Sequence, residues 1–90
     1  MAPEIHIAGV LVQARPEACA AVREAIACSA QAQVVQHAAD GRIVVVVEAG
    51  SAGEVVQRLE AMRTLPGVLN VALVYQHAEP AAAMQQEMPT

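Results

Sequence analysis

Aromatic residues are nearly absent from this chain of 90 residues, which contains one Tyr and no Trp or Phe. Its apolar content comes instead from Val, Ala, Leu and Ile. A single domain of this size buries only about 60% of its unfolded surface. We therefore expect an aliphatic core of modest size and no large active-site cleft.

Lysine is absent as well, and the five Arg residues are outnumbered by nine Asp and Glu, which gives a formal net charge of -4. Such a chain has no cationic surface for a phosphate backbone, so nucleic acid is not an expected partner. An acidic balance is also common on ordinary solvated surfaces. The charge therefore permits a basic peptide as partner without identifying one.

Export signals and long apolar segments are also missing. Residues 1–4 carry no positive charge on a side chain, and the apolar run that follows is short and interrupted by His6. Cys19 and Cys28 lie in a segment of helical pattern, with a rise of about 13 Å between them, which no disulfide bridges. We expect reduced thiols that pack against the helix surroundings, a cytoplasmic protein, and no membrane insertion.

Hydrophobic periodicity predicts six elements: a strand over 5–13, a helix over 16–28, a polar edge strand over 31–37, a strand over 42–48, a helix between Ser51 and Pro66-Gly67, and a last strand ending at 77. The dipeptide Asp40-Gly41 is typical of a tight hairpin. Ser51 and Glu54 have the spacing of a capping box. Pro66-Gly67 is a helix stop.

This order predicts an α+β fold, the ferredoxin-like βαββαβ sandwich, with a four-stranded antiparallel sheet and both helices on one face. The domain is expected to span residues 5–77, after a flexible N-terminus of residues 1–4. Residues 78–90 include two prolines and no sustained apolar stripe, which favours a disordered tail.

Catalytic and metal-binding patterns are not found. The cysteines lack CxxC spacing, no serine has a base and acid arranged around it, and no glycine-rich phosphate loop is present. His37 and His77 close the predicted second and fourth strands, which are opposite edges, three spacings of about 4.8 Å apart. The three histidines, His6 included, are therefore too far apart to bind one metal ion, whose ligand bonds are about 2 Å. We expect no enzyme, metal site or cofactor.

The sheet face without helices is the candidate site, because an exposed aliphatic patch of this size indicates a partner. Alternation places Tyr75 with Val71 and Leu73 on the covered face. The first strand is apolar on both sides, so Ile7, Gly9 and Leu11 are an alternative to Val10 and Val12 as its binding residues. Closure of a weak homodimer through the patch is another alternative. The predicted binding residues are Val10, Val12, Val44, Val46, Glu48, Asn70, Ala72, Val74 and Gln76.

Three segments resemble the NapD family, assembly chaperones of periplasmic nitrate reductase: Val10 to Glu17, Gly41 to Ala49, and Pro66 to Glu79. The resemblance covers residues 5 to 79. It implies a cytoplasmic protein that binds the twin-arginine signal peptide of the nitrate reductase catalytic subunit. Binding would delay export until that client has folded around its molybdenum cofactor and iron-sulfur cluster, which belong to the client.

A twin-arginine peptide has a basic end and an apolar stretch, which suit an aliphatic face with acidic neighbours. Glu48 is the candidate partner of an arginine, with Glu79 and Glu4 as less central candidates. The alternative function is a small dimeric domain of the amino-acid-sensing ferredoxin-like kind, in which Pro-Gly-Val also precedes a last strand. We expect it less, because this chain has no attached catalytic or DNA-binding domain for a sensor to control.

Overall fold

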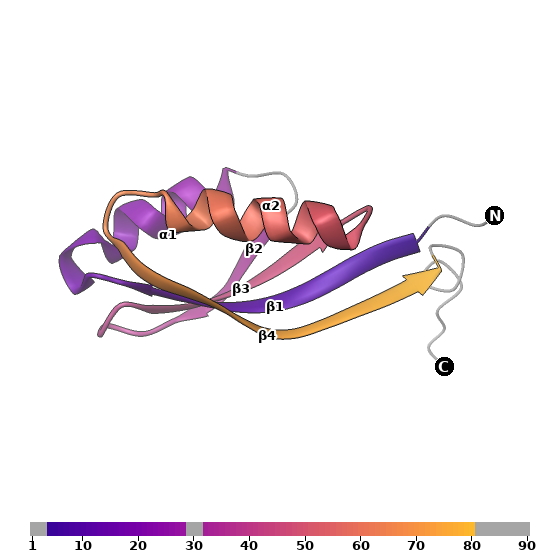
Figure 1. Ribbon diagram of the computed structural model, residues 1–90. Helices are drawn as coiled ribbons and strands as arrows, with labels where there is room; N and C mark the ends of the chain where they lie inside the picture. Colours follow the sequence, from indigo (N-terminus) through magenta and orange to yellow (C-terminus); the bar gives the residue numbers. More distant parts are fainter. Residues whose placement is uncertain (1–3, 29–31, 81–90) are drawn as a thin grey trace, which may run out of the picture.

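Helices and strands follow one another in the predicted order (Figure 1). The computed structural model describes residues 4–28 and 32–80. Its strands pair in the order β2-β3-β1-β4, and every neighbouring pair is antiparallel. The predicted ferredoxin-like α+β fold is confirmed. The elements are β1 (Glu4–Ala14), a 3-10 turn η1 (Pro16–Ala18), α1 (Cys19–Ala27), β2 (Ala32–His37), β3 (Arg42–Ala49), α2 (Ala52–Arg63) and β4 (Val68–Pro80).

The core lies between the sheet and the two helices, which cover the same face (Figure 1). Every second residue of β1 and β3 points into it, as strand geometry requires. The helices contribute apolar residues three to four positions apart. The buried side chains include Ala8, Val10, Val12, Ala14, Ile43, Val45, Val47, Ala49, Val22, Ile26, Val55, Leu59 and Met62.

The start of α2 has the predicted cap. The Ser51 hydroxyl accepts a hydrogen bond from the backbone N–H of Glu54 at 3.2 Å. The Glu54 carboxylate in turn accepts from the backbone N–H of Gly50 at 2.9 Å, one residue before the position that a standard capping box uses. Two backbone donors at the helix start are thereby satisfied.

Replacing this cap gives a testable effect on stability. Ser51→Ala removes the acceptor for the Glu54 N–H and should lower the free energy of unfolding by about 1 kcal/mol, whereas Ser51→Asp should restore most of it. Urea denaturation followed by circular dichroism measures both. Equal midpoints for Ser51→Ala and the unsubstituted protein would show that the cap contributes nothing.

The sheet is longer than expected at one end. β1 begins at Glu4 and β4 continues to Pro80, and the two residues pair across the strands. Residues 78–80 are therefore strand, not tail, because the first residues of β1 supply backbone partners for them. Figure 1 shows this end of β1 and β4 reaching beyond α2. The rest of the predicted flexible ends, residues 1–3 and 81–90, lies outside the described residues.

The cysteines occupy different surroundings. Cys19 is buried at the start of α1, as expected, and Cys28 is exposed at its C-cap. Both are free thiols in the structure. The expectation that Cys28 packs is wrong, because its position falls on the exposed side of α1, away from the buried stripe of Cys19, Val22 and Ile26. Across residues 4–28 and 32–80, no helix has the length and apolar character needed to cross a membrane.

Candidate functional site

The candidate site is the sheet face opposite the helices, called here the open face. Directly paired residues of neighbouring strands project to the same face, so the register defines its members. Leu11 pairs with Val44 on one side and Ala72 on the other, and Gly9 likewise pairs with Val46 and Tyr75. The open face consists of Ile5, Ile7, Gly9, Leu11, Gln13, Arg42, Val44, Val46, Glu48, Asn70, Ala72, Tyr75, His77, Glu79, Gln33 and Gln36.

The register of β1 corrects two predicted binding residues. Val10 and Val12 are 1% and 0% exposed and face the helices, so their expected place on the open face is wrong. The alternative set, Ile7, Gly9 and Leu11, is the one on the open face. Both faces of β1 are apolar, and a one-residue difference in register exchanges them completely.

Polar residues identify the open side of β1 once its pairing with β3 is known. Glu48 cannot lie in an aliphatic core, and it pairs with Ile7. At the other end of the strands Gln13 pairs with Arg42. The polar positions on β3 and β1 therefore mark the odd-numbered residues of β1 as the open side.

A bulge at Val74 changes the face assignments on β4. Val10 pairs with Leu73 and Gly9 with Tyr75, so Val74 has no partner on β1. Beyond it the alternation is inverted. Tyr75 moves to the open face, and Gln76 pairs with Ala8 on the helix side. The expected placements of Tyr75 and Gln76 are therefore wrong.

The predicted residues that precede the bulge on β4, and those on β3, lie where they were expected. Asn70 and Ala72 lie on the open face as expected, opposite Gln13 and Leu11. Val74 is 67% exposed at the edge of the sheet and outside the paired ladder. On β3, Val44, Val46 and Glu48 lie on the open face as predicted. Tyr75 and His77 lie on the open face but were not among the predicted binding residues, and Glu79 was predicted only as a less central candidate.

The apolar centre of the open face consists of Leu11, Val44, Val46, Ala72 and Tyr75. Val44 is 38% exposed and Tyr75 is 51% exposed. The other three are partly buried, because neighbouring side chains in the sheet shield them. No described element covers this centre (Figure 1). An uncovered aliphatic surface with one aromatic ring is suited to contact an apolar partner.

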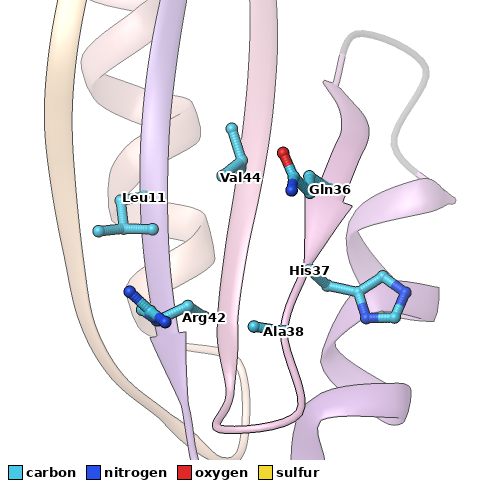
Figure 2. Close-up of a pocket in the computed structure, with 6 residues that line it drawn as sticks. All are labelled: Leu11, Gln36, His37, Ala38, Arg42 and Val44. Atoms are coloured by element: carbon cyan, nitrogen blue, oxygen red, sulfur yellow. The ribbon is translucent and has the colours of Figure 1, made fainter.

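A hollow of about 240 Å³ adjoins the apolar centre near the β2–β3 hairpin (Figure 2). Leu11 and Val44 line it with apolar surface, while Gln36 and Arg42 supply polar groups at its margin. Figure 2 shows His37 directed away from the other labelled side chains. This agrees with its pairing to Ile43, a core residue.

The end of the open face beyond Val46 is acidic. Glu48 lies there on β3, and Glu79 lies on β4 with its carboxylate 2.9 Å from the ring nitrogen of His77. Among residues 4–28 and 32–80, Glu48 makes no ion pair. Glu4 projects to the other side, 3.4 Å from His6, although it lines with Glu48 a hollow of about 220 Å³ at the end of the strands. Glu48 thus retains a carboxylate available for a cation.

The opposite end holds the pair Arg42 and Asp40, whose side chains approach to 2.9 Å. The hydrogen bond from the Arg42 side chain lowers the pKa of Asp40 from its ordinary value. Gln13 also donates to the backbone carbonyl of Asp40 at 3.2 Å. The two ends of the open face therefore differ in charge: Arg42 and Asp40 neutralise each other at one end, whereas Glu48 has no described cationic partner at the other.

Metal ligation is not indicated by the geometry. His37 and His77 lie on β2 and β4, which are the opposite edges of the sheet as predicted. Within the part of the chain that the structure describes, no three His, Cys, Asp or Glu side chains are grouped to hold an ion.

Comparison with known proteins identifies the family. The model of the NapD protein family matches residues 5–80. The chain belongs to the NapD family. A solved relative is the E. coli Tat proofreading chaperone protein NapD, studied in solution, which aligns with a TM-score of 0.77 and 28% sequence identity. The alignment covers 100% of this chain and 90% of that one. No curated protein matches the chain.

Membership in the NapD family settles the class of the protein. It is a Tat proofreading chaperone family and not a family of enzymes. The amino-acid-sensing alternative is left without support. All residues of the open face, from Ile5 to Glu79, lie within the part of the chain that the NapD model matches.

Proposed function

We propose that this protein is a cytoplasmic chaperone that binds the twin-arginine signal peptide of the periplasmic nitrate reductase catalytic subunit on its open face. Membership in the NapD family supports a role in Tat proofreading, as does the similarity to the E. coli Tat proofreading chaperone protein NapD. The observation that carries the proposal is an apolar centre that none of the described elements covers, with the Glu48 carboxylate at one end making no ion pair within residues 4–28 and 32–80.

The open face matches the two chemical parts of such a peptide. Its apolar stretch would bury Leu11, Val44, Val46 and Ala72, and the basic end would lie at Glu48, where a charge-assisted hydrogen bond fixes orientation. The compensated pair of Arg42 and Asp40 at the other end offers no comparable attraction to a cation. The peptide would therefore bind in one direction along the sheet.

Binding of the signal peptide to the chaperone is enough to delay export. While the signal peptide is bound, its arginines and apolar stretch are in contact with the chaperone and unavailable to the export machinery. The bound fraction depends on chaperone concentration relative to Kd, so release needs no chemical step. The interval gives the client time to fold around its molybdenum cofactor and iron-sulfur cluster before transport. This chain needs no cofactor for that role.

The direct test is isothermal titration calorimetry with two peptides. One carries the paired arginines followed by the apolar stretch, and the other has both arginines replaced by glutamine. We expect the first to bind and the second to bind at least about tenfold more weakly, since the charge-assisted contact with Glu48 is lost. Equal affinities would show that the arginines are not recognised.

Glu48→Gln is expected to weaken binding of the arginine peptide about tenfold, because the side chain keeps its size and loses the charge that pairs with arginine. Glu24→Gln, the same change on the exposed surface of α1, is the matched control and should alter affinity less than about twofold. Calorimetry at two salt concentrations measures both effects. The peptide that lacks both arginines should bind Glu48→Gln and the unsubstituted protein with equal affinity. If Glu48→Gln instead weakened its binding about tenfold as well, Glu48 would not be the partner of an arginine.

A further inference from the structure

The bulge at Val74 gives the open face its one aromatic side chain. Without it, continuous alternation from Ala72 would point Tyr75 toward the helices. With Val74 unpaired, Tyr75 instead lies opposite Gly9 on the open face. Bulges commonly redirect a side chain in this way beside functional sites.

Gly9 provides the space that the Tyr75 ring occupies. A Cβ added to Gly9 would lie 2.2 Å from Cε1 of that ring and 2.6 Å from Cδ1, so no other residue type fits without moving it. Gly9 has no positive φ, and its role is therefore steric and not conformational. The ring lies across β1 and remains 51% exposed.

We propose that Tyr75 is the anchor of the peptide site, the side chain against which the apolar stretch of the signal peptide packs. This inference rests on the proposed function. The neighbours of Tyr75 in the apolar centre are aliphatic, and its ring is the largest side chain there. Tyrosine is enriched among residues that dominate binding energy, and a ring already held against Gly9 loses little conformational entropy on binding.

The register also relates Tyr75 to the charge that would orient the peptide. Gly9, which holds the ring, pairs with Val46, and Glu48 lies two residues farther along β3, at a distance of about 7 Å. An arginine that pairs with Glu48 therefore brings the residues next to it over Tyr75. The basic and apolar parts of one peptide can make both contacts at once.

Tyr75 can be observed directly, since the chain contains one Tyr and no Trp. A signal peptide without Tyr or Trp leaves Tyr75 as the only strong source of emission. We expect acrylamide quenching of that emission to fall when the peptide binds, because the ring becomes covered. Unchanged quenching of Tyr75 under conditions where calorimetry shows binding would overturn the inference and leave the proposed function standing.

Two other outcomes would also overturn it. If calorimetry detects no peptide binding to the unsubstituted protein, the proposed function fails and the role of Tyr75 fails with it. If quenching depends on protein concentration and not on peptide, the ring is covered by a second copy of this chain.

Substitutions test the same inference through affinity. Tyr75→Leu should weaken peptide binding about tenfold and Tyr75→Phe less than about twofold, since the ring and not the hydroxyl makes the contact. Gly9→Ala retains the Tyr75 ring but displaces it, and should weaken peptide binding several-fold. Circular dichroism should show that this variant is still folded. Unchanged affinity in Tyr75→Leu would show that Tyr75 is not the anchor.

Discussion

Val46→Asp is expected to abolish binding of the twin-arginine peptide, lowering affinity by at least about a hundredfold. Val46 lies in the middle of the open face beside Gly9, so an aspartate there would be covered by the apolar stretch without a partner for its charge. Leaving a charge buried and unpaired at an interface costs about 3–5 kcal/mol. In the free protein the same side chain reaches solvent, and the fold should persist.

Val56→Asp is the matched control for this prediction. Val56 is 57% exposed on α2, on the far side of the sheet from the open face. The same substitution there should leave affinity within about twofold, because exposed surface changes have small effects. Calorimetry gives the affinities, and far-ultraviolet circular dichroism confirms folding. Normal binding by Val46→Asp would place the peptide elsewhere on the molecule.

Much of the fold could be predicted because local signals agree with one another. Asp40-Gly41 marks the β2–β3 hairpin, the Ser51 and Glu54 pair marks the start of α2, and Pro66-Gly67 marks its end. The two glycines adopt positive φ angles that few other residues favour, and the Ser51 and Glu54 side chains accept hydrogen bonds from backbone N–H groups at the start of α2. Gly67, with a φ of 90°, adopts the left-handed conformation that glycine tolerates best.

The details of the open face were harder to predict, since they depend on pairing between distant strands. β1 is apolar on both sides, so its own pattern does not distinguish the buried Val10 from the open Leu11. The bulge at Val74 interrupts a uniform apolar segment without a Gly or Pro to mark it. Val44, Val46 and Glu48 were placed correctly because β3 ends in polar residues that specify its faces.

The β2–β3 hairpin connects the fold to the site, because it sets which residues of β3 face outward. Gly41 has a φ of +100°, and a Cβ there would lie 2.0 Å from the backbone oxygen of Ala14. The Gly41 carbonyl also accepts a hydrogen bond from the Ala14 N–H at 2.8 Å. This close approach fixes the start of β3 against the end of β1, and a slip by one residue would exchange Val46 with Val47.

Gly41→Ala should therefore lower the free energy of unfolding by about 3 kcal/mol, from the strained φ and the contact with a backbone atom that cannot move away. Gly50→Ala is the control, since the nearest atom to its added Cβ would be 3.5 Å away and its φ is not in the left-handed range. It should change stability by less than about 1 kcal/mol. Urea denaturation midpoints measure both. Equal midpoints would mean that the hairpin tolerates a side chain at residue 41, and that the register of the open face is held by strand pairing farther along β1 and β3.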